Sequence, residues 1–380
     1  MDVQSRLTFA KTAKVAKFIL KDSDFFGAPD DKVFVAGRNL DEILALVANF
    51  NGPMARKVID LFCGPTGQVH ASSVEAGHVA EKFDYLVGGE GHNFLTKDGF
   101  FVALKMVLHC APGSLIVGGP PCSLFVWLSL GFTKRNEKIE GDTTKASVLA
   151  SNALVHNMVV LLAIAHCRGV WFLLEQPSTS RMYRADFLAE FLAQVNPHRI
   201  WTWMRCFGHD MDKPTVLYAT LPFAFRLKRI LRMGTAKAKT NKNYHSKTKD
   251  GRWVQGGPDL QSSAQYTPGF ATAILDCWGR ACRSFGSPEP QSQDCLVALL
   301  HKAKITDEAT IVRYLLSPAQ SSPAETMAKA KTSPETNGKT PKGAPLTNRA
   351  NKQDGKATVS GPQKKQKKQL TLTAMFAKTS

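Results

Sequence analysis

The feature that most constrains the fold is an alternation of short apolar runs with longer helical stretches between residues 57 and 220. Each apolar run is long enough for one strand and ends near glycine, proline or a polar residue. Strands that alternate with helices favour a mostly parallel sheet with helices on both faces, so we expect a doubly wound α/β domain. The expected strands are 58–62, 79–83, 114–117, 170–174 and 216–219, and the clearest expected helices are 99–108, 146–166 and 185–195.

Changes in composition divide the chain into five segments. An N-terminal extension precedes the α/β core, and an irregular segment rich in lysine and arginine follows it. Further helical patterns come next and are apolar enough to pack back on the core. The last segment is rich in Ala, Thr, Ser, Pro, Lys and Gly, so it cannot bury enough apolar surface to offset its ordering entropy, and we expect a disordered tail. The segments are 1–53, 54–220, 221–265, 266–316 and 317–380.

The charge balance favours a polyanionic partner. The chain has 49 lysines and arginines against 31 aspartates and glutamates, a net charge of +18. This excess argues against a small-metabolite enzyme and makes nucleic acid the first hypothesis. The alternative is an ordinary enzyme with a basic tail.

The cysteines and the apolar stretches bear on the compartment. Eight cysteines are scattered without a Cys-x-x-Cys pair, which is typical of buried thiols in a reducing compartment and implies neither a zinc site nor a disulfide framework. Lysines interrupt the apolar runs near the N-terminus, and we expect no later stretch of roughly 18 charge-free apolar residues. We therefore expect a soluble intracellular protein with no membrane partner and no metal.

A strand followed by a glycine-containing turn indicates a cofactor site. Residues 58–67 run from an apolar strand through Asp60 into a tight turn with Gly64 and Gly67, which lets a ligand approach the backbone. Asp84 follows the next expected strand, about twenty residues after the turn, where doubly wound folds often hold the ribose hydroxyls of a cofactor. The alternatives are an ordinary strand-to-helix turn and a solvated aspartate.

The third expected strand ends in a loop that presents a thiol. In Gly-Gly-Pro-Pro-Cys at 118–122, two prolines hold the backbone at Cys122. A free thiol has a pKa of about 8.5, so a nucleophilic role requires a positive charge or a helix N-terminus close by. The fourth strand is followed by Glu175, and the ends of neighbouring parallel strands meet in one crevice. Cys122 and Glu175 are therefore candidate catalytic partners; the alternative for Glu175 is an exposed or salt-bridged carboxylate.

Together these segments resemble the cytosine-5 DNA methyltransferase family, whose hallmarks are a DLFxGxGG turn, a Pro-Cys loop and a Glu-Asn-Val strand end. The resemblance covers residues 58–220 and 269–278, and Lys-Pro-Thr at 213–215 is similar to a segment of divergent, phage-like members. Thr66 replaces the middle glycine of the turn, and Gln176-Pro177 replaces Asn-Val. The family's Gln-x-Arg-x-Arg motif is absent, which leaves three candidates to support the target base: Arg181, Arg184 and Arg205.

The resemblance implies a fold of the S-adenosylmethionine-dependent methyltransferase type and a reaction on a cytosine that is flipped out of its duplex. In that reaction the Cys122 thiolate adds to C6 of the base, Glu175 holds N3 and the exocyclic amine, and the cofactor S-adenosylmethionine supplies the methyl group for C5. The cofactor-binding residues implied by the resemblance are Asp60, Phe62, Gly64, Gly67, Asp84 and Pro120.

The basic segment 221–265 is the candidate nucleic-acid recognition segment. Its lysines and arginines suit phosphate contacts, which give affinity and salt dependence. The segment is short for the family, so we expect modest sequence specificity. The candidate DNA contacts are Arg226, Lys228, Arg229, Arg232, Lys237 and Lys239.

The tail carries two further motifs. The basic cluster at 364–368 is typical of a nuclear localisation signal, the alternative being generic solvated charge in a cytoplasmic protein. The segment after it resembles the sliding-clamp-binding peptide, in which a glutamine enters a small pocket and apolar residues form a hydrophobic plug. Its expected contact residues are Gln369, Leu372, Met375 and Phe376, with Met375 in place of the first aromatic residue.

Three hypotheses of function follow. The first is an active cytosine-5 methyltransferase that acts on DNA and is recruited to it through the tail. The second is a catalytically inactive protein of the same fold that binds nucleic acid or the replication sliding clamp, which Thr66, Gln176 and the missing arginine motif favour. The third is another cofactor-dependent enzyme on this fold, including an RNA cytosine-5 methyltransferase, since the fold does not fix the reaction.

Overall fold

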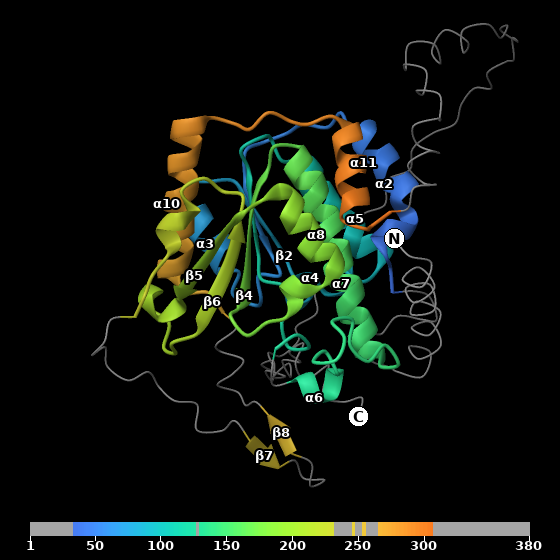
Figure 1. The fold of residues 1–380 in the computed structure, drawn as a ribbon. Helices are drawn as coiled ribbons and strands as arrows, with labels where there is room; N and C mark the ends of the chain where they lie inside the picture. Colours follow the sequence, from blue (N-terminus) through green and yellow to red (C-terminus); the bar gives the residue numbers. More distant parts are fainter. Residues whose placement is uncertain (1–32, 127–128, 232–244, 248–252, 256–264, 307–380) are drawn as a thin grey trace, which may run out of the picture. The chain divides into compact units, whose positions relative to one another are not determined.

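A six-stranded sheet lies at the centre of the computed structural model, which describes residues 33–126, 129–231, 245–247, 253–255 and 265–306 (Figure 1). The strands follow the order β2-β1-β3-β4-β6-β5 across the sheet. Strand β1 pairs in parallel with β2 and β3, and β3 pairs in parallel with β4, whereas β6 runs antiparallel to both β4 and β5. The sheet is therefore mixed but mostly parallel. The strands are β1 (Val58–Leu61), β2 (Ala80–Phe83), β3 (Leu115–Gly118), β4 (Trp171–Pro177), β5 (His198–Trp203) and β6 (Pro214–Ala219).

Five of the six strands were expected from their apolar runs, and their ends differ from the expected ones by at most three residues. The sequence pattern did not predict β5. This strand forms one edge of the sheet, and of its residues Ile200 and Thr202 are the buried ones. An edge strand with one solvent-facing side has no continuous apolar run, which is why periodicity alone missed it.

Helices cover both faces of the sheet (Figure 1). On one face, α3 (Gln68–Glu75) and α10 (Pro268–Phe285) pack together and share an apolar core with β1, β3 and β4. On the other face, α5 (Lys97–Leu108), α7 (Ala146–Cys167), α8 (Asp186–Val195) and α11 (Gln293–Lys302) form a second layer. There the Phe172 ring of β4 lies 5.8 Å from the Phe191 ring of α8. The expected α/β class, with a mostly parallel sheet and helices on both faces, is confirmed.

Local signals set where several helices begin. Thr96, Thr267 and Ser292 precede α5, α10 and α11, and each hydroxyl accepts a hydrogen bond from the backbone N–H three residues later. Pro268 opens α10, where the missing N–H of proline leaves no partner unsatisfied. The shorter helices are α2 (Leu40–Ala48), α4 (Tyr85–Gly88) and α6 (Leu130–Thr133), and the 3-10 helices are η2 (Ala36–Asn39), η3 (Gly89–His92), η5 (Met182–Arg184), η6 (Met204–Phe207) and η7 (Ala224–Leu227).

Helix α7 corrects one expectation. It has 22 residues, none of them charged, and is long and apolar enough to cross a membrane. In the fold, 89% of its apolar window is buried, and the helix packs against α5, α8 and α11. It is therefore a core helix of this layer, and the expectation that the chain has no such stretch was wrong.

The segments outside the core are described in part. The structure describes the N-terminal extension from residue 33, including α2. In the basic segment it places η7 and an antiparallel pair, β7 (His245–Lys247) and β8 (Trp253–Gln255), where the sequence predicted an irregular loop. The tail, with its basic cluster and its clamp-binding-like peptide, lies outside the described residues.

Candidate active site

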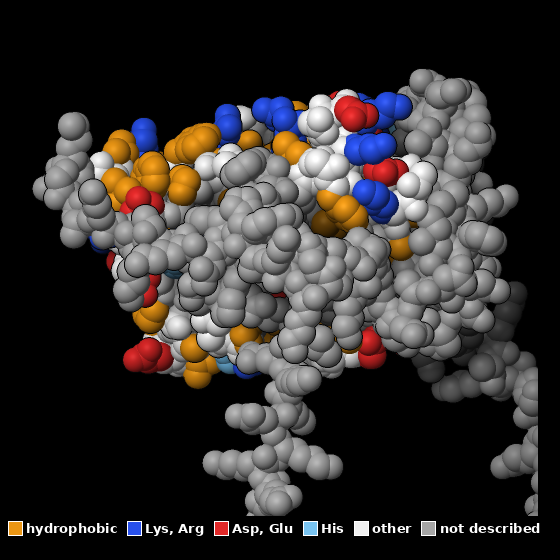
Figure 2. Space-filling model, turned by 90° about the horizontal axis from the view of Figure 1, so that it is seen from below, with side chains coloured by type: hydrophobic (Ala, Val, Ile, Leu, Met, Phe, Trp, Pro, Cys, Tyr) orange, Lys and Arg blue, Asp and Glu red, His pale blue; other side chains and the backbone are white. Residues whose placement is uncertain are grey.

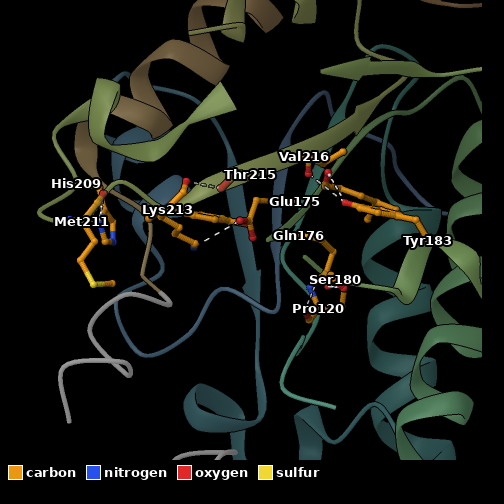
Figure 3. Close-up of polar contacts among 12 residues, drawn as sticks. Pro120, Glu175, Gln176, Ser180, Tyr183, His209, Met211, Lys213, Thr215 and Val216 are labelled. Atoms are coloured by element: carbon orange, nitrogen blue, oxygen red, sulfur yellow. Dashed lines mark hydrogen bonds and ion pairs between the residues drawn. The ribbon is translucent and has the colours of Figure 1, made fainter. Parts of the chain in front are cut away.

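Residues that the sequence singled out lie where β1, β3 and β4 end. These three strands are parallel neighbours, so their carboxyl ends share one edge of the sheet. Asp60 lies in β1, the Pro-Pro-Cys loop follows β3, and Glu175 lies in β4. Figure 3 shows the part of this edge around Glu175. The fold thus brings together residues that are far apart in the sequence.

Asp60 is fully buried beneath the turn that follows β1. Its Oδ2 accepts a hydrogen bond of 3.0 Å from the backbone N–H of His70, whereas Oδ1 has no hydrogen-bond partner among the described residues. Burial raises the pKa of this carboxyl to about 6, against the opposing effect of the His70 and Val69 N–H groups. A buried oxygen without a donor carries a free-energy cost, which a ligand with a donor group can relieve.

The backbone of the turn itself is open to a ligand. Gly64 has a φ of +64°, and a Cβ added there meets no atom within 4 Å. Phe62 also has a positive φ, and its ring packs 5.2 Å from the Phe94 ring. Thr66, which replaces a family glycine, is exposed and has no positive φ, so its side chain is accommodated without backbone strain.

Asp84 joins the end of β2 to this turn. Its Oδ2 accepts a hydrogen bond of 3.0 Å from the Gly64 N–H, and its Oδ1 accepts one of 2.7 Å from the Leu86 N–H. Burial raises the pKa of the Asp84 carboxyl, and these two N–H groups oppose that rise. Each carboxylate oxygen keeps capacity for a second donor. Asp60, Gly64 and Asp84 therefore fit a ligand that carries hydroxyl or ammonium donors.

Gln176 anchors the loop that carries Cys122. Its Nε2 donates a hydrogen bond of 2.6 Å to the Pro120 carbonyl, and its Oε1 accepts one of 2.7 Å from the Ser180 hydroxyl (Figure 3). The Gln176 side chain is buried, so both bonds are shielded from water. The residue that departs from the family's Asn-Val therefore ties β4 to the Pro-Pro-Cys loop.

Cys122 is half-buried beside Glu175. Burial and the negative charge of Glu175 raise the pKa of the Cys122 thiol to about 11, while the positive charge of Lys213 acts to lower it. Cys122 therefore rests as the thiol at neutral pH. It becomes a nucleophile only where positive charge or a bound substrate stabilises the thiolate.

Glu175 lies between a cation and a phenol, and Figure 3 shows the cation, Lys213, beside it. Its Oε1 lies 3.4 Å from Nζ of Lys213, and its Oε2 lies 3.5 Å from the Tyr266 hydroxyl. Oε1 accepts no hydrogen bond among the described residues. Burial and the charge of Glu175 raise the pKa of Tyr266, so the phenol keeps its proton and points its donor at the carboxylate. Oε1 of Glu175 is thus ion-paired with Lys213 and keeps capacity to accept a hydrogen bond.

The three candidate arginines make other contacts or face solvent. Nη1 of Arg181 donates a hydrogen bond of 2.8 Å to the Arg135 carbonyl. Nη1 of Arg205 lies 3.5 Å from Oδ1 of Asp212. Arg184 is exposed at the end of η5. In the described residues, the cation in contact with Glu175 is Lys213 instead.

Arg135 supports the site although no sequence signal pointed to it. Its guanidinium is buried, lies 3.9 Å from the Phe125 ring, and donates to the Leu124 carbonyl and to Asn152 of α7. Through these contacts Arg135 links the segment after Cys122 to α7. Arg135 stands in a charged stretch of sequence, where a solvated side chain is the ordinary expectation.

Lys213 and Tyr266 were also missed as site residues. Lys213 belongs to the Lys-Pro-Thr segment, which is the one signal that points to it, and Tyr266 has no sequence signal. The described residues contain no group of three or more His, Cys, Asp or Glu side chains that could hold a metal ion.

The structure describes three of the six predicted nucleic-acid contacts. Arg226, Lys228 and Arg229 are exposed in and after η7. On the face drawn in Figure 2, the described Lys and Arg side chains lie among acidic and hydrophobic ones. Arg232, Lys237 and Lys239 lie outside the described residues, as do the four predicted clamp contacts.

The chain has no match among protein-family models, and a search of curated proteins also found none. The resemblance to cytosine-5 methyltransferases therefore rests on the motifs and on where the fold places them.

Proposed function

We propose that this chain is an S-adenosylmethionine-dependent cytosine-5 methyltransferase that acts on DNA. The observation that carries the proposal is the placement of Cys122 and Glu175 at neighbouring parallel strands, close enough for the Glu175 charge to raise the Cys122 pKa. A thiol nucleophile beside a carboxylate that can accept the exocyclic amine N–H of the base suits addition to C6 of cytosine.

The sheet supports the methyltransferase type of α/β fold. One antiparallel strand, β6, lies between β4 and the edge strand β5. This mixed but mostly parallel sheet is compatible with the doubly wound α/β fold that the resemblance implies. Fold likeness alone does not fix a reaction, so the site residues carry more weight than the sheet.

Cys122, Glu175 and Tyr266 each have a separate role in the proposed reaction. Cys122 forms the bond to C6, and the loop that Gln176 anchors holds the sulfur in place. Glu175 accepts the exocyclic N–H of the base through Oε1, which has no other hydrogen bond among the described residues. Tyr266 stays protonated and donates to the other oxygen of Glu175.

The turn after β1 is the proposed cofactor site. Asp60 offers a buried acceptor without a donor, Gly64 leaves open space beside its backbone, and Asp84 lies against the same turn. When bound, S-adenosylmethionine supplies an electrophilic methyl group. Phe62, Gly67 and Pro120 complete the proposed set of cofactor contacts.

We further propose that DNA is held by the basic segment through phosphate contacts. The basic cluster of the tail is proposed to direct the protein to the nucleus, and the peptide after it to bind the replication sliding clamp. These proposals rest on the sequence.

A covalent trap tests the reaction. The protein is incubated with S-adenosylmethionine and a duplex that contains 5-fluorocytosine, and denaturing electrophoresis detects a covalent complex. Fluorine at C5 cannot leave as the proton does, so the Cys122 adduct persists. We expect an adduct with the wild type and with Cys295→Ser, which removes an exposed thiol, and none with Cys122→Ser.

The outcomes separate the three hypotheses. An adduct that survives Cys122→Ser overturns Cys122 as the nucleophile. Binding of DNA and cofactor without an adduct favours the inactive binding protein. An adduct that forms with 5-fluorocytidine RNA but not with the duplex favours an RNA methyltransferase.

A further inference from the structure

A lysine lies at the centre of the candidate site. Lys213 directly precedes β6, and its side chain is 13% exposed. Its Nζ lies 3.4 Å from Oε1 of Glu175, whose side chain is 7% exposed (Figure 3). The same Nζ lies 5.9 Å from the centre of the Tyr266 ring. Lysine is seldom buried this far unless its charge has a partner. The fold therefore places a positive charge where the substrate base is proposed to bind.

The backbone holds Lys213 firmly. Its φ of +35° is in the left-handed region, which side chains other than glycine adopt at a cost. Its carbonyl accepts hydrogen bonds of 3.2 Å from the Met204 N–H and 3.0 Å from the Thr215 hydroxyl. The strained backbone is thus fixed from two sides, which aims the side chain at Glu175.

The Lys213 ammonium of the Lys213–Glu175 pair keeps N–H donors that make no hydrogen bond within the pair. A charge-assisted hydrogen bond between ammonium and carboxylate is typically about 2.7–2.9 Å long. At 3.4 Å the two groups attract one another without that bond, and the ammonium has three N–H donors. The contact therefore leaves Lys213 donors for a third polar group.

Electrostatics link the same ammonium to the nucleophile. The groups that face Cys122 are Glu175 from β4, Lys213 before β6 and Tyr183 from η5, and Tyr266 before α10 faces the same carboxylate. Both tyrosines are neutral, since burial raises their pKa values, and Glu175 opposes the thiolate. Among these groups Lys213 supplies the positive charge that favours the thiolate.

We propose that Lys213 is a further catalytic residue, whose ammonium stabilises the Cys122 thiolate and then the negative charge on the N3–C2–O2 edge of the cytosine. This inference rests on the proposed function. The thiol proton goes to solvent as the thiolate forms. The sulfur then bonds to C6, the C5=C6 π pair moves between C4 and C5, and the C4=N3 π pair becomes a lone pair on N3 shared with O2. Lys213 would therefore support the target base, the role for which the sequence suggested three candidate arginines.

Alkylation of the thiol tests the charge effect without any nucleic acid. Iodoacetamide reacts with the thiolate, and mass spectrometry of the Cys122 peptide gives its rate, with exposed Cys295 as the internal reference. At about pH 8.5 we expect Lys213→Met to slow Cys122 alkylation about tenfold, because the pKa rises by about one pH unit. Lys213→Arg retains most of the rate, and Lys105→Met, which removes an exposed lysine of α5, retains all of it. An unchanged rate in Lys213→Met overturns the proposal.

Lys213→Met leaves Glu175 buried without its cation, and this variant can fail to fold. A second pair of variants keeps the proposal testable in that case. Glu175→Gln removes the negative charge and is expected to speed Cys122 alkylation. Addition of Lys213→Met to that variant leaves no unpaired charge and is expected to slow the reaction again. Equal rates in the single and double variants contradict a role for Lys213.

The 5-fluorocytosine trap separates this inference from the proposed function. We expect Lys213→Met to form the adduct about 100-fold more slowly at saturating DNA, with partial rescue by Lys213→Arg. If the wild type forms the adduct and Lys213→Met matches its rate, the Lys213 proposal fails while the function stands. If the wild type forms no adduct, the proposed function fails, and the alkylation rates still decide whether Lys213 supports the thiolate.

Discussion

The side-chain amide of Gln176 donates a 2.6 Å hydrogen bond to the carbonyl of Pro120 and so ties strand β4 to the loop that presents Cys122. This bond joins the two strand ends on which the proposed chemistry depends. It also gives the departure from the family's Glu-Asn-Val motif a structural role, because the longer side chain of glutamine reaches the neighbouring loop.

Gln176→Leu keeps the size of the side chain and removes both of its hydrogen bonds. We expect a loss of about 1–3 kcal/mol in the free energy of unfolding, because the Pro120 carbonyl is left without its donor. Cys122 adduct formation is expected to slow at least about tenfold. Urea unfolding and the 5-fluorocytosine trap measure the two effects. The control is Ser180→Ala, which removes the bond to Gln176 Oε1 and a 3.3 Å bond from the Met182 N–H but keeps the bond to Pro120. Adduct formation by Gln176→Leu at the wild-type rate contradicts the anchoring role.

Gly119→Ala is predicted to disturb the contact between Tyr266 and Glu175. A Cβ at Gly119 lies 2.4 Å from the Tyr266 hydroxyl oxygen, so the ring must move. We expect slower adduct formation, with partial recovery when Tyr266→Phe removes that oxygen. Gly131→Ala is the matched control, because a Cβ there meets no atom within 4 Å. The trap assay compares these variants with the wild type, and equal rates for Gly119→Ala and Gly131→Ala count against the contact.

Asp60 predicts a dependence of stability on pH. Its pKa is about 6 in the fold and 3.8 ordinarily, so the folded protein holds this proton more tightly than the unfolded chain. The stabilisation is fully present below about pH 4 and is lost as the pH rises through about 6. Asp60→Asn, which mimics the protonated form, is expected to be more stable than the wild type at about pH 8, by on the order of 3 kcal/mol. The advantage shrinks toward about pH 4.

Urea unfolding at several pH values checks the Asp60 prediction. A wild type that is the more stable protein at about pH 8 contradicts it. The same variant is expected to bind S-adenosylmethionine more weakly, because the amide presents a donor where the cofactor needs an acceptor; calorimetry measures this separately.

The basic segment predicts the salt dependence of DNA binding. Neutralisation of the exposed Arg226, Lys228 and Arg229 is expected to weaken binding and to lower the slope of log K against log salt by about 0.9 for each phosphate that the variant no longer neutralises. Fluorescence titration at several salt concentrations measures the slope. The control neutralises three exposed lysines elsewhere: Lys97, Lys105 and Lys302. Equal slopes for the two triple variants contradict a role for the basic segment in DNA binding.

The peptide at the end of the tail predicts clamp binding. A synthetic peptide of residues 369–380 is expected to bind the sliding clamp, and its Phe376→Ala variant is expected to bind at least about tenfold more weakly, because the plug loses its aromatic ring. Calorimetry compares the two peptides. Equal binding rejects the clamp proposal.

Local pattern determined much of the fold and named part of the site. Buried parallel strands appear as apolar runs, so β1, β2, β3, β4 and β6 could be predicted, and the residues at their ends followed from the rule that parallel strands share one carboxyl edge. That rule paired Cys122 with Glu175, whereas Asp84 followed from its spacing after the glycine-containing turn and Asp60 from the family resemblance. Strand β5 could not be predicted in this way, because its exposed edge position leaves it without an apolar run.

The tertiary structure decided the charges and contacts around those residues. Gln176, Lys213 and Tyr266 reach the Pro-Pro-Cys loop and Glu175 from three separate segments, and such long-range contacts leave no period in the sequence. The sequence could not choose among three arginines because proximity to Glu175 depends on how β6 pairs with β4, and that pairing favours a lysine. The chain by itself determined which polar groups stand near the strand ends, and packing decided which charge each of them faces.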